Sequence, residues 1–169
     1  MLKLSKAKAL FHQNVMTVFD MLNTNLKYHA LVDPGLCIGT GSTSEVKIAN
    51  TTTFLHNGIF KSKSSAEVAF TATTHDIEAD ADTIQEACYL VCLNAVGTIT
   101  LTMGTIASGS GNSLLPEIPS GVTPIGYLRL AVAAGTTDFD ASSDALSDGH
   151  LTDTYVNLGF LSPRFDTTQ

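Results

Sequence analysis

Apolar residues recur at steps of three and four along the first thirty residues, which is the spacing of one face of an α-helix. The pattern predicts an amphipathic helix from residue 5 to about residue 29, with Ser5 as its N-terminal cap. The apolar stripe consists of Phe11, Val15, Val18, Leu22 and Leu26, and Met16 and Phe19 lie beside it. A face this wide has to be covered either by the same chain or by a neighbouring copy, and the sequence leaves both alternatives open.

From Asp33-Pro34-Gly35 onward, apolar and polar residues alternate between closely spaced turn-forming residues. This pattern is typical of β-strands. The sequence therefore predicts a mainly β fold, either an antiparallel β-sandwich or a jelly-roll-like barrel, with one N-terminal amphipathic α-helix. We divide the chain accordingly into a helical segment for attachment or oligomerisation, residues 1–34, and a β-sandwich body, residues 35–169.

Individual strands can be placed from the turn chemistry. Asn57-Gly58 favours a type I′ turn, which predicts a β-hairpin over residues 52–61. Further strands are expected over residues 67–73, 89–94, 98–103, 125–132 and 154–160. Within 98–103, Ile99, Leu101 and Met103 face one side and three threonines the other, which indicates one buried and one solvated face. Residues 107–113 are expected to form a flexible tip of small residues, and three prolines stiffen residues 115–124.

The net charge of −7 is divided unevenly along the chain. Residues 1–63 hold seven Lys and three acidic residues, whereas residues 64–169 hold two Arg and thirteen acidic residues. Because so acidic a body repels phosphates, we expect no nucleic-acid partner, while Lys3, Lys6 and Lys8 could dock on an acidic protein surface. No apolar run is long enough to cross a bilayer and no secretory signal is recognisable, so we expect no membrane partner.

Acidic residues gather in two groups along the chain. Asp76, Glu78, Asp80 and Asp82 resemble the start of a calcium loop, but Ala81 and Ala87 occupy the positions that require Gly and Glu. A solvated acidic loop is the favoured interpretation. The second group, Asp138, Asp140, Asp144 and Asp148, is irregularly spaced among small residues and is interpreted as loop caps and turns. The sequence predicts no metal and no cofactor.

Other residue types give no catalytic constellation either. The five histidines form no zinc-binding spacing, and no Gly-x-Ser-x-Gly motif accompanies His75-Asp76. A glycine-rich segment at 39–44 lacks the third glycine of a dinucleotide fingerprint. Cys37, Cys88 and Cys92 contain no CxxC pair and are interpreted as reduced core residues. We therefore expect a binding or structural protein and not an enzyme.

Several stretches within residues 64–160 resemble small virion proteins that tailed bacteriophages and prophages encode near their capsid genes. These stretches are residues 65–77, 86–91, 115–119, 123–130, 139–141 and 150–155. The resemblance implies a trimeric, β-rich decoration, head-fibre or appendage protein. It supplies no catalytic residues.

Together, the residues and the resemblance lead to one expectation and one alternative. We expect a non-enzymatic phage virion protein, synthesised in the host bacterial cytoplasm, that forms a homotrimer and decorates or stabilises the capsid exterior. Its partners would be copies of itself and the major capsid protein or neighbouring virion proteins. The expected interface consists of Lys3, Lys6, Lys8, Phe11, Val15, Val18, Leu22 and Leu26. The alternative is a host-surface-binding module of a tail fibre or appendage.

Overall fold

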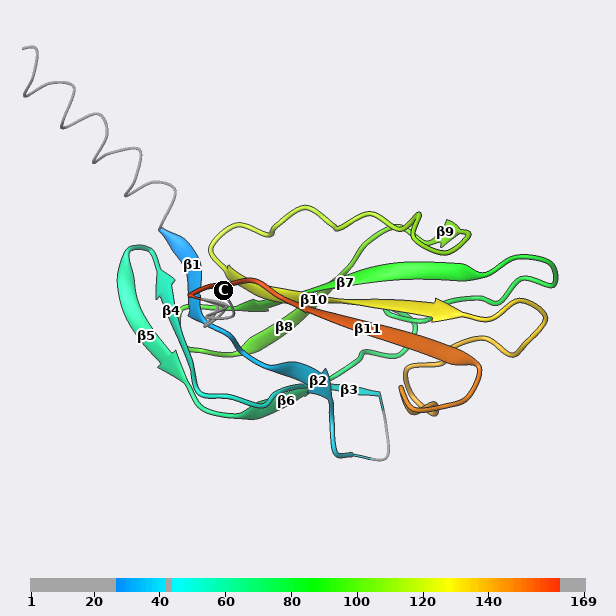
Figure 1. Cartoon of the computed structure of the whole chain (residues 1–169), viewed down its shortest axis with the longest axis horizontal. Coiled ribbons are helices and arrows are strands. Elements are labelled where there is room, and N and C mark those ends of the chain that lie inside the picture. The colour runs from blue at the N-terminus through cyan, green and yellow to red at the C-terminus, as the bar shows by residue number, and fades with distance from the viewer. Residues whose placement is uncertain (1–26, 42–43, 162–169) are drawn as a thin grey trace, which may run out of the picture.

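The described part of this computed structural model covers residues 27–41 and 44–161, and it is mainly β with antiparallel sheets (Figure 1). No helix lies within these residues. The strands are β1 (Tyr28–Val32), β2 (Leu36–Ile38), β3 (Glu45–Ile48), β4 (Thr52–His56), β5 (Ile59–Lys63), β6 (Ala66–Ala69), β7 (Gln85–Leu93), β8 (Ile99–Met103), β9 (Ala107–Ser108), β10 (Thr123–Val132), β11 (Leu151–Asn157) and β12 (Gly159–Leu161).

The strands form three sheets. The largest has the order β11-β10-β7-β8, with β9 paired to the start of β7, and the smallest has the order β2-β3-β6. The smallest sheet lies across the largest, since β2 contacts β11 and β6 contacts β8. The third sheet, β12-β1-β4-β5, forms one end of the molecule, and its β1–β12 pair is parallel (Figure 1).

One hydrophobic core joins the three sheets. Its largest fully buried side chains include Tyr89, Phe54, Phe139, Ile48 and Ile77, which come from strands and from the loops between them. Strand β7 is buried on both faces. Alternate residues from Ala87 to Leu93 face this core, and the intervening residues, among them Cys88 and Cys92, are also buried.

The predicted hairpin is confirmed. Strands β4 and β5 pair from Thr52–Lys63 to His56–Ile59, and both turn residues have positive φ, 53° at Asn57 and 76° at Gly58. These are the backbone angles that a type I′ turn requires. The core-facing side predicted for β8 is confirmed, because Ile99, Leu101 and Met103 all pack on the core. Thr100 and Thr102 on the other face are half-buried and not fully solvated.

The predicted helix was extended too far. Residues 28 and 29, which were assigned to it, belong to β1, where Tyr28 is paired with His56 of β4 and Ala30 with Gly159 of β12. Pairing on both edges satisfies the backbone of β1, and this outweighs the continuation of the helical spacing. Strand β1 thus belongs to the β body, although it lies within the segment 1–34 that was assigned to the helix. The rest of the predicted helix lies outside the described residues.

Two further predicted strands have different bounds. The strand expected over 67–73 ends at Ala69, because the backbone N–H groups of Thr74 and His75 both bond to the carbonyl of Thr71 and form a turn. The strand expected over 154–160 is divided between β11 and β12, which lie in different sheets. The N–H of Leu158 donates to the carbonyl of Ile125, and the chain then crosses to pair with β1.

Candidate functional site

All residues of the predicted interface lie outside the described residues. They are Lys3, Lys6, Lys8, Phe11, Val15, Val18, Leu22 and Leu26. The candidate site therefore has to be sought among the other polar clusters and exposed surfaces of the β body.

The two acidic segments, far apart in the sequence, lie side by side. Ile77 and Phe139 form an antiparallel bridge, and the N–H of Ala79 donates to Asp138 Oδ1 at 2.7 Å. The carboxylates of this acidic end accept hydrogen bonds from nearby backbone groups. Asp80 accepts from the N–H groups of residues 82 and 83, and Asp140 accepts from the N–H and hydroxyl of Ser142.

These hydrogen bonds lower the pKa of Asp80 and the pKa of Asp140 below the ordinary value of an aspartate. The interpretation as loop caps and turns is confirmed for Asp140, Asp144 and Asp148, which accept from backbone N–H groups two to four residues away, and Asp80 in the first group has the same role. Asp138 instead joins the two segments through Ala79. In residues 27–41 and 44–161, no group of three or more His, Cys, Asp or Glu side chains is arranged to hold a metal ion.

A buried histidine supports the loop that leads into this acidic end. His75 Nδ1 accepts a hydrogen bond from the N–H of Thr71 at 2.8 Å, and its carbonyl accepts one from the Tyr89 hydroxyl at 2.6 Å. The His75 ring packs edge-to-face on Phe70 and Tyr89. Burial lowers the pKa of His75 below its ordinary value, and the nearby Asp76 carboxylate offsets only part of this effect.

We expect acidification to destabilise the protein through His75. Its lowered pKa means that the folded state favours the neutral form of the ring. The contribution of His75 to the free energy of unfolding is therefore complete above the unfolded pKa of about 6.5, and it declines as the pH falls from there toward the folded pKa. In His75→Asn, the Asn oxygen can still accept from Thr71 but does not titrate. Between about pH 7.5 and about pH 5.5, the melting temperature should fall further in the wild type than in this variant. Equal falls in the melting temperature of the two proteins, measured by calorimetry, would contradict the role assigned to His75.

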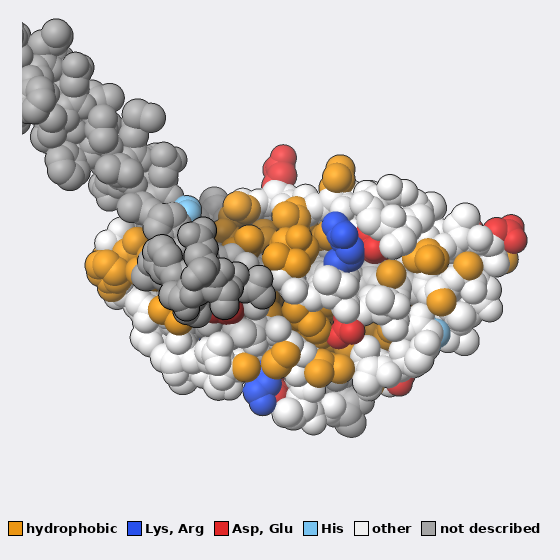
Figure 2. Space-filling model, viewed as in Figure 1, with side chains coloured by type: hydrophobic (Ala, Val, Ile, Leu, Met, Phe, Trp, Pro, Cys, Tyr) orange, Lys and Arg blue, Asp and Glu red, His pale blue; other side chains and the backbone are white. Residues whose placement is uncertain are grey.

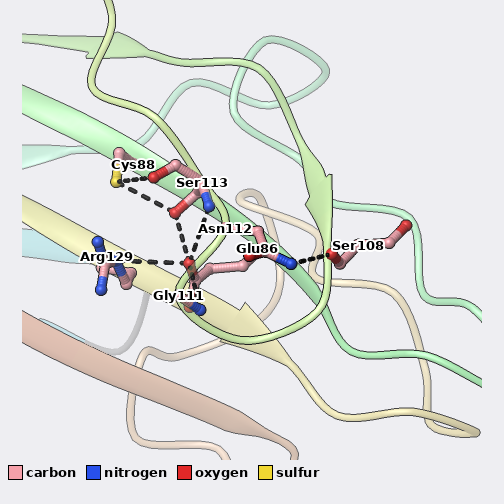
Figure 3. A network of polar contacts seen from close by, with 7 residues as sticks. All are labelled: Glu86, Cys88, Ser108, Gly111, Asn112, Ser113 and Arg129. Carbon is pink, nitrogen blue, oxygen red and sulfur yellow. Dashed lines mark hydrogen bonds and ion pairs between the residues drawn. The ribbon is translucent and has the colours of Figure 1, made fainter.

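A second buried network surrounds Glu86, whose residue is only 2% exposed (Figure 3). Glu86 Oε1 accepts hydrogen bonds from the Ser113 hydroxyl at 2.5 Å and from the Ser113 N–H at 3.3 Å, and Gly111 N–H donates at 3.1 Å to Oε2. Arg129 Nε lies 3.4 Å from the same carboxylate. The Cys88 sulfur lies 3.2 Å from the Ser113 hydroxyl.

The network fixes the segment that was expected to be a flexible tip. Burial opposes ionisation of Glu86, but the donors of Ser113 and Gly111 and the charge of Arg129 outweigh it, so the pKa of Glu86 lies below its ordinary value. The ionised carboxylate thus holds residues 111–113, while β9 pairs residues 107 and 108 with β7. Serine, cysteine and glutamate are residue types that also act in catalytic sites. Here all three side chains are buried, so the arrangement fits an anchor for the loop.

The interpretation of the cysteines as core residues is confirmed for Cys88 and Cys92 but not for Cys37. Cys37, Cys88 and Cys92 are all free thiols, with Cys88 and Cys92 buried and Cys37 half-buried. Burial raises the pKa of Cys92 to about 12, so this thiol remains protonated and unreactive near neutral pH.

The exposed apolar residues are the feature that distinguishes the surface. Six large hydrophobic side chains are between 48% and 85% exposed, and the next in order, Leu158, is 41% exposed. The six lie in two regions, which we call two groups: Ile59 and Phe60 on the opposite faces of β5 with Val96 of the β7–β8 turn, and Leu114, Leu115 and Ile118 of the segment between β9 and β10. Figure 2 shows hydrophobic side chains at the left end, where β5 lies in Figure 1, and along the upper edge, where the segment between β9 and β10 runs.

Both groups border shallow depressions. One of about 470 Å³ lies between β5 and the β7–β8 turn and is lined by Phe54, Lys61, Ser62, Ala95, Val96 and Gly97. The other, of about 460 Å³, is lined by Met103, Gly104, Thr105, Leu114, Leu115, Pro116 and Glu117. Shallow, partly apolar surfaces of this kind suit contact with another macromolecule better than enclosure of a small ligand.

Comparisons of the chain with known protein families, with curated proteins and with solved structures give no match. The residues that the structure describes contain no helix with the length and apolar character needed to cross a membrane.

Proposed function

We propose that this chain is a non-enzymatic structural protein of a tailed-bacteriophage virion, a homotrimer with a β-sandwich body that decorates and stabilises the exterior of the head. The observation that carries the contact role is the gathering of the six most exposed large hydrophobic residues into two groups. The assignment to a virion rests on the resemblance of the stretches within residues 64–160 to phage virion proteins. Its partners would be further copies of itself and the major capsid protein or neighbouring virion proteins.

The chemistry of the described residues supports a contact protein. Glu86 and Ser113 hold a loop, His75 holds a turn, and Asp80 and Asp140 cap turns, so these polar groups serve the fold. The acidic body also keeps copies soluble through mutual repulsion at the high local concentration of a particle surface.

The alternative, a host-binding module of a tail fibre or appendage, is less well supported. Sugar-binding surfaces commonly present several exposed aromatic rings. Among the aromatic side chains whose exposure the structure describes, Phe60 alone is exposed. The Gly/Ser segment that would have served as an adaptable contact tip is held by Glu86.

The test is a map of the intact particle compared with a map of particles assembled without this chain. We expect difference density with threefold symmetry on the outer surface of the head. Density confined to a tail fibre would favour the alternative, and absence of the chain from purified virions would overturn the proposal.

The role proposed for the N-terminal segment is tested by co-sedimentation of the chain with particles that lack it. Removal of residues 1–26 is the appropriate truncation, because β1 begins at Tyr28 and should be kept intact. We expect a folded β body, verified by circular dichroism, that no longer binds. The full-length triple variant Lys3→Glu, Lys6→Glu, Lys8→Glu should lose more binding at about 0.05 M salt than at about 0.5 M salt. Undiminished binding by the folded truncation would move the attachment surface to the β body.

A further inference from the structure

The two exposed apolar groups are accompanied by charges of opposite sign. Ile59, Lys61 and Lys63 share one face of β5, beside Val96 of the β7–β8 turn, and we call these four residues the basic patch; Phe60 lies on the opposite face of β5. The patch joins two elements, because Lys61 Nζ donates to the Ala95 carbonyl at 2.6 Å and the Lys63 side chain lies beside Gly97. No acidic residue occurs in residues 51–63 or 94–98, which supply both elements.

The second group carries a carboxylate. Leu114, Leu115 and Ile118 surround Glu117 in the sequence, and we call these four residues the acidic strip. Glu117 is exposed, and it is the one acidic residue between positions 87 and 137. Apolar side chains with two ammonium groups on one surface thus match apolar side chains with a carboxylate on the other.

The acidic strip is held in place before any partner binds. Ser113, directly before it, is fixed by Glu86, and the Leu114 carbonyl packs so closely on Gly104 that an added Cβ there would lie 2.5 Å from it. Pro116 and Pro119 restrict the backbone of the strip itself. A surface ordered in advance loses little conformational entropy when it docks.

Pairing of identical edges is disfavoured for the basic patch. In the described sheet β12-β1-β4-β5, strand β5 is at the edge and pairs with β4. Antiparallel pairing of β5 with β5 of a second copy would bring the lysines of both copies together, and like charges across a strand pair are destabilising. A contact between two different surfaces avoids this repulsion, and such heterologous contacts are what close a cyclic oligomer.

We propose that the basic patch of one copy docks on the acidic strip of the next copy, with Lys61 and Lys63 flanking Glu117, and with Ile59 and Val96 covering the apolar side chains of the strip. This inference rests on the closed homo-oligomer of the proposed function, and it places a subunit contact on the β body. A ring of three copies would then repeat one contact three times.

The test uses the full-length chain in sedimentation velocity over a dilution series. Lys63→Glu and Glu117→Lys should each weaken association roughly tenfold, because each places like charges opposite one another. The double variant carrying both changes should recover to within about threefold of the wild type, since the charges are then exchanged and not lost. Val96→Asp should also weaken association, and it should leave the fold intact because Val96 is 85% exposed.

Two variants just before the start of β7, at the opposite end of this strand from Val96, serve as matched controls. Glu78→Lys makes the same change of charge as Glu117→Lys, also at an exposed acidic residue. Ile84→Asp makes the same kind of change as Val96→Asp, also at an exposed apolar residue. Neither control variant should alter association. Unchanged association in Lys63→Glu and Glu117→Lys, or no recovery in the double variant, would overturn the proposed contact. A wild type that stays monomeric would overturn both the contact and the trimer. The particle map decides separately whether the chain is a virion protein.

Discussion

Replacing Glu86 by alanine should cost about 3 kcal/mol of folding free energy, which corresponds to a fall in melting temperature of about 6–12 °C. The physical reason is that the substitution removes the acceptor for the Ser113 hydroxyl and for the N–H groups of Ser113 and Gly111. Buried donors without a partner lose their hydration and gain nothing in return. The measurement is urea unfolding followed by circular dichroism.

A graded series separates this network from a simple effect of charge. Glu86→Gln keeps one acceptor oxygen but places an amide nitrogen against other donors, and it should cost about 1–2 kcal/mol. Glu117→Gln removes the same charge from an exposed site and should change the folding free energy by less than about 0.5 kcal/mol.

A second readout locates the effect. In Glu86→Ala, subtilisin should cut the chain near residues 107–113 faster than in the wild type, because the loop has lost its anchor. Equal stability of Glu86→Ala and Glu117→Gln, with no new cleavage in the loop, would show that the network does not hold the loop.

The parts of the fold that could be predicted from the sequence are those governed by local chemistry. Asn57-Gly58 specifies its own turn, and the alternation of Ile99, Leu101 and Met103 with threonines marks a strand with one face on the core. The role of the aspartates as turn caps also follows from contacts within a few residues, such as Asp140 with Ser142.

The parts that were missed depend on residues distant in the chain. Strand β7 begins four residues before the predicted start, because its two faces are both buried and no alternation marks it. Glu86 meets its main partner, Ser113, 27 positions away. A single carboxylate directly before the apolar run 87–93 was the available signal, since an acidic residue in such a position has to be paired.

The candidate contact surfaces show the same division. The predicted interface was drawn from helical periodicity in residues that lie outside the described part of the chain. The exposure of both Ile59 and Phe60 could not be inferred from the sequence, because side chains alternate between the two faces of a strand and one of the two would be expected to be buried. Leu114 and Leu115 gave a usable signal, because two leucines between a Gly/Ser segment and a proline lie in a loop, where apolar residues have no strand to bury them.

The second large effect is expected at Gly126, where the pairing of β7 and β10 shifts register. A Cβ at this position would lie 2.5 Å from the Val156 carbonyl oxygen of β11 and would overlap the Leu36 side chain of β2. The carbonyl belongs to a strand that is paired with β10 along its whole length, so it cannot move without breaking that ladder. Gly126→Ala should therefore cost about 2–3 kcal/mol, the upper part of the usual range for overpacking a well-filled core.

Gly149→Ala is the matched control for this effect. A Cβ at Gly149 would meet nothing within 4 Å, and the residue has no positive φ. Alanine there reduces the freedom of the unfolded chain and should leave the protein unchanged or more stable by about 0.4–1 kcal/mol. The two variants have the same composition, so the effect of replacing glycine on the unfolded state is similar in both. The difference between their free energies of unfolding in urea therefore reports the close approach of β2 and β11 to β10. If Gly126→Ala unfolds at the same urea concentration as Gly149→Ala, the packing of the small sheet across the large one is looser than these contacts require.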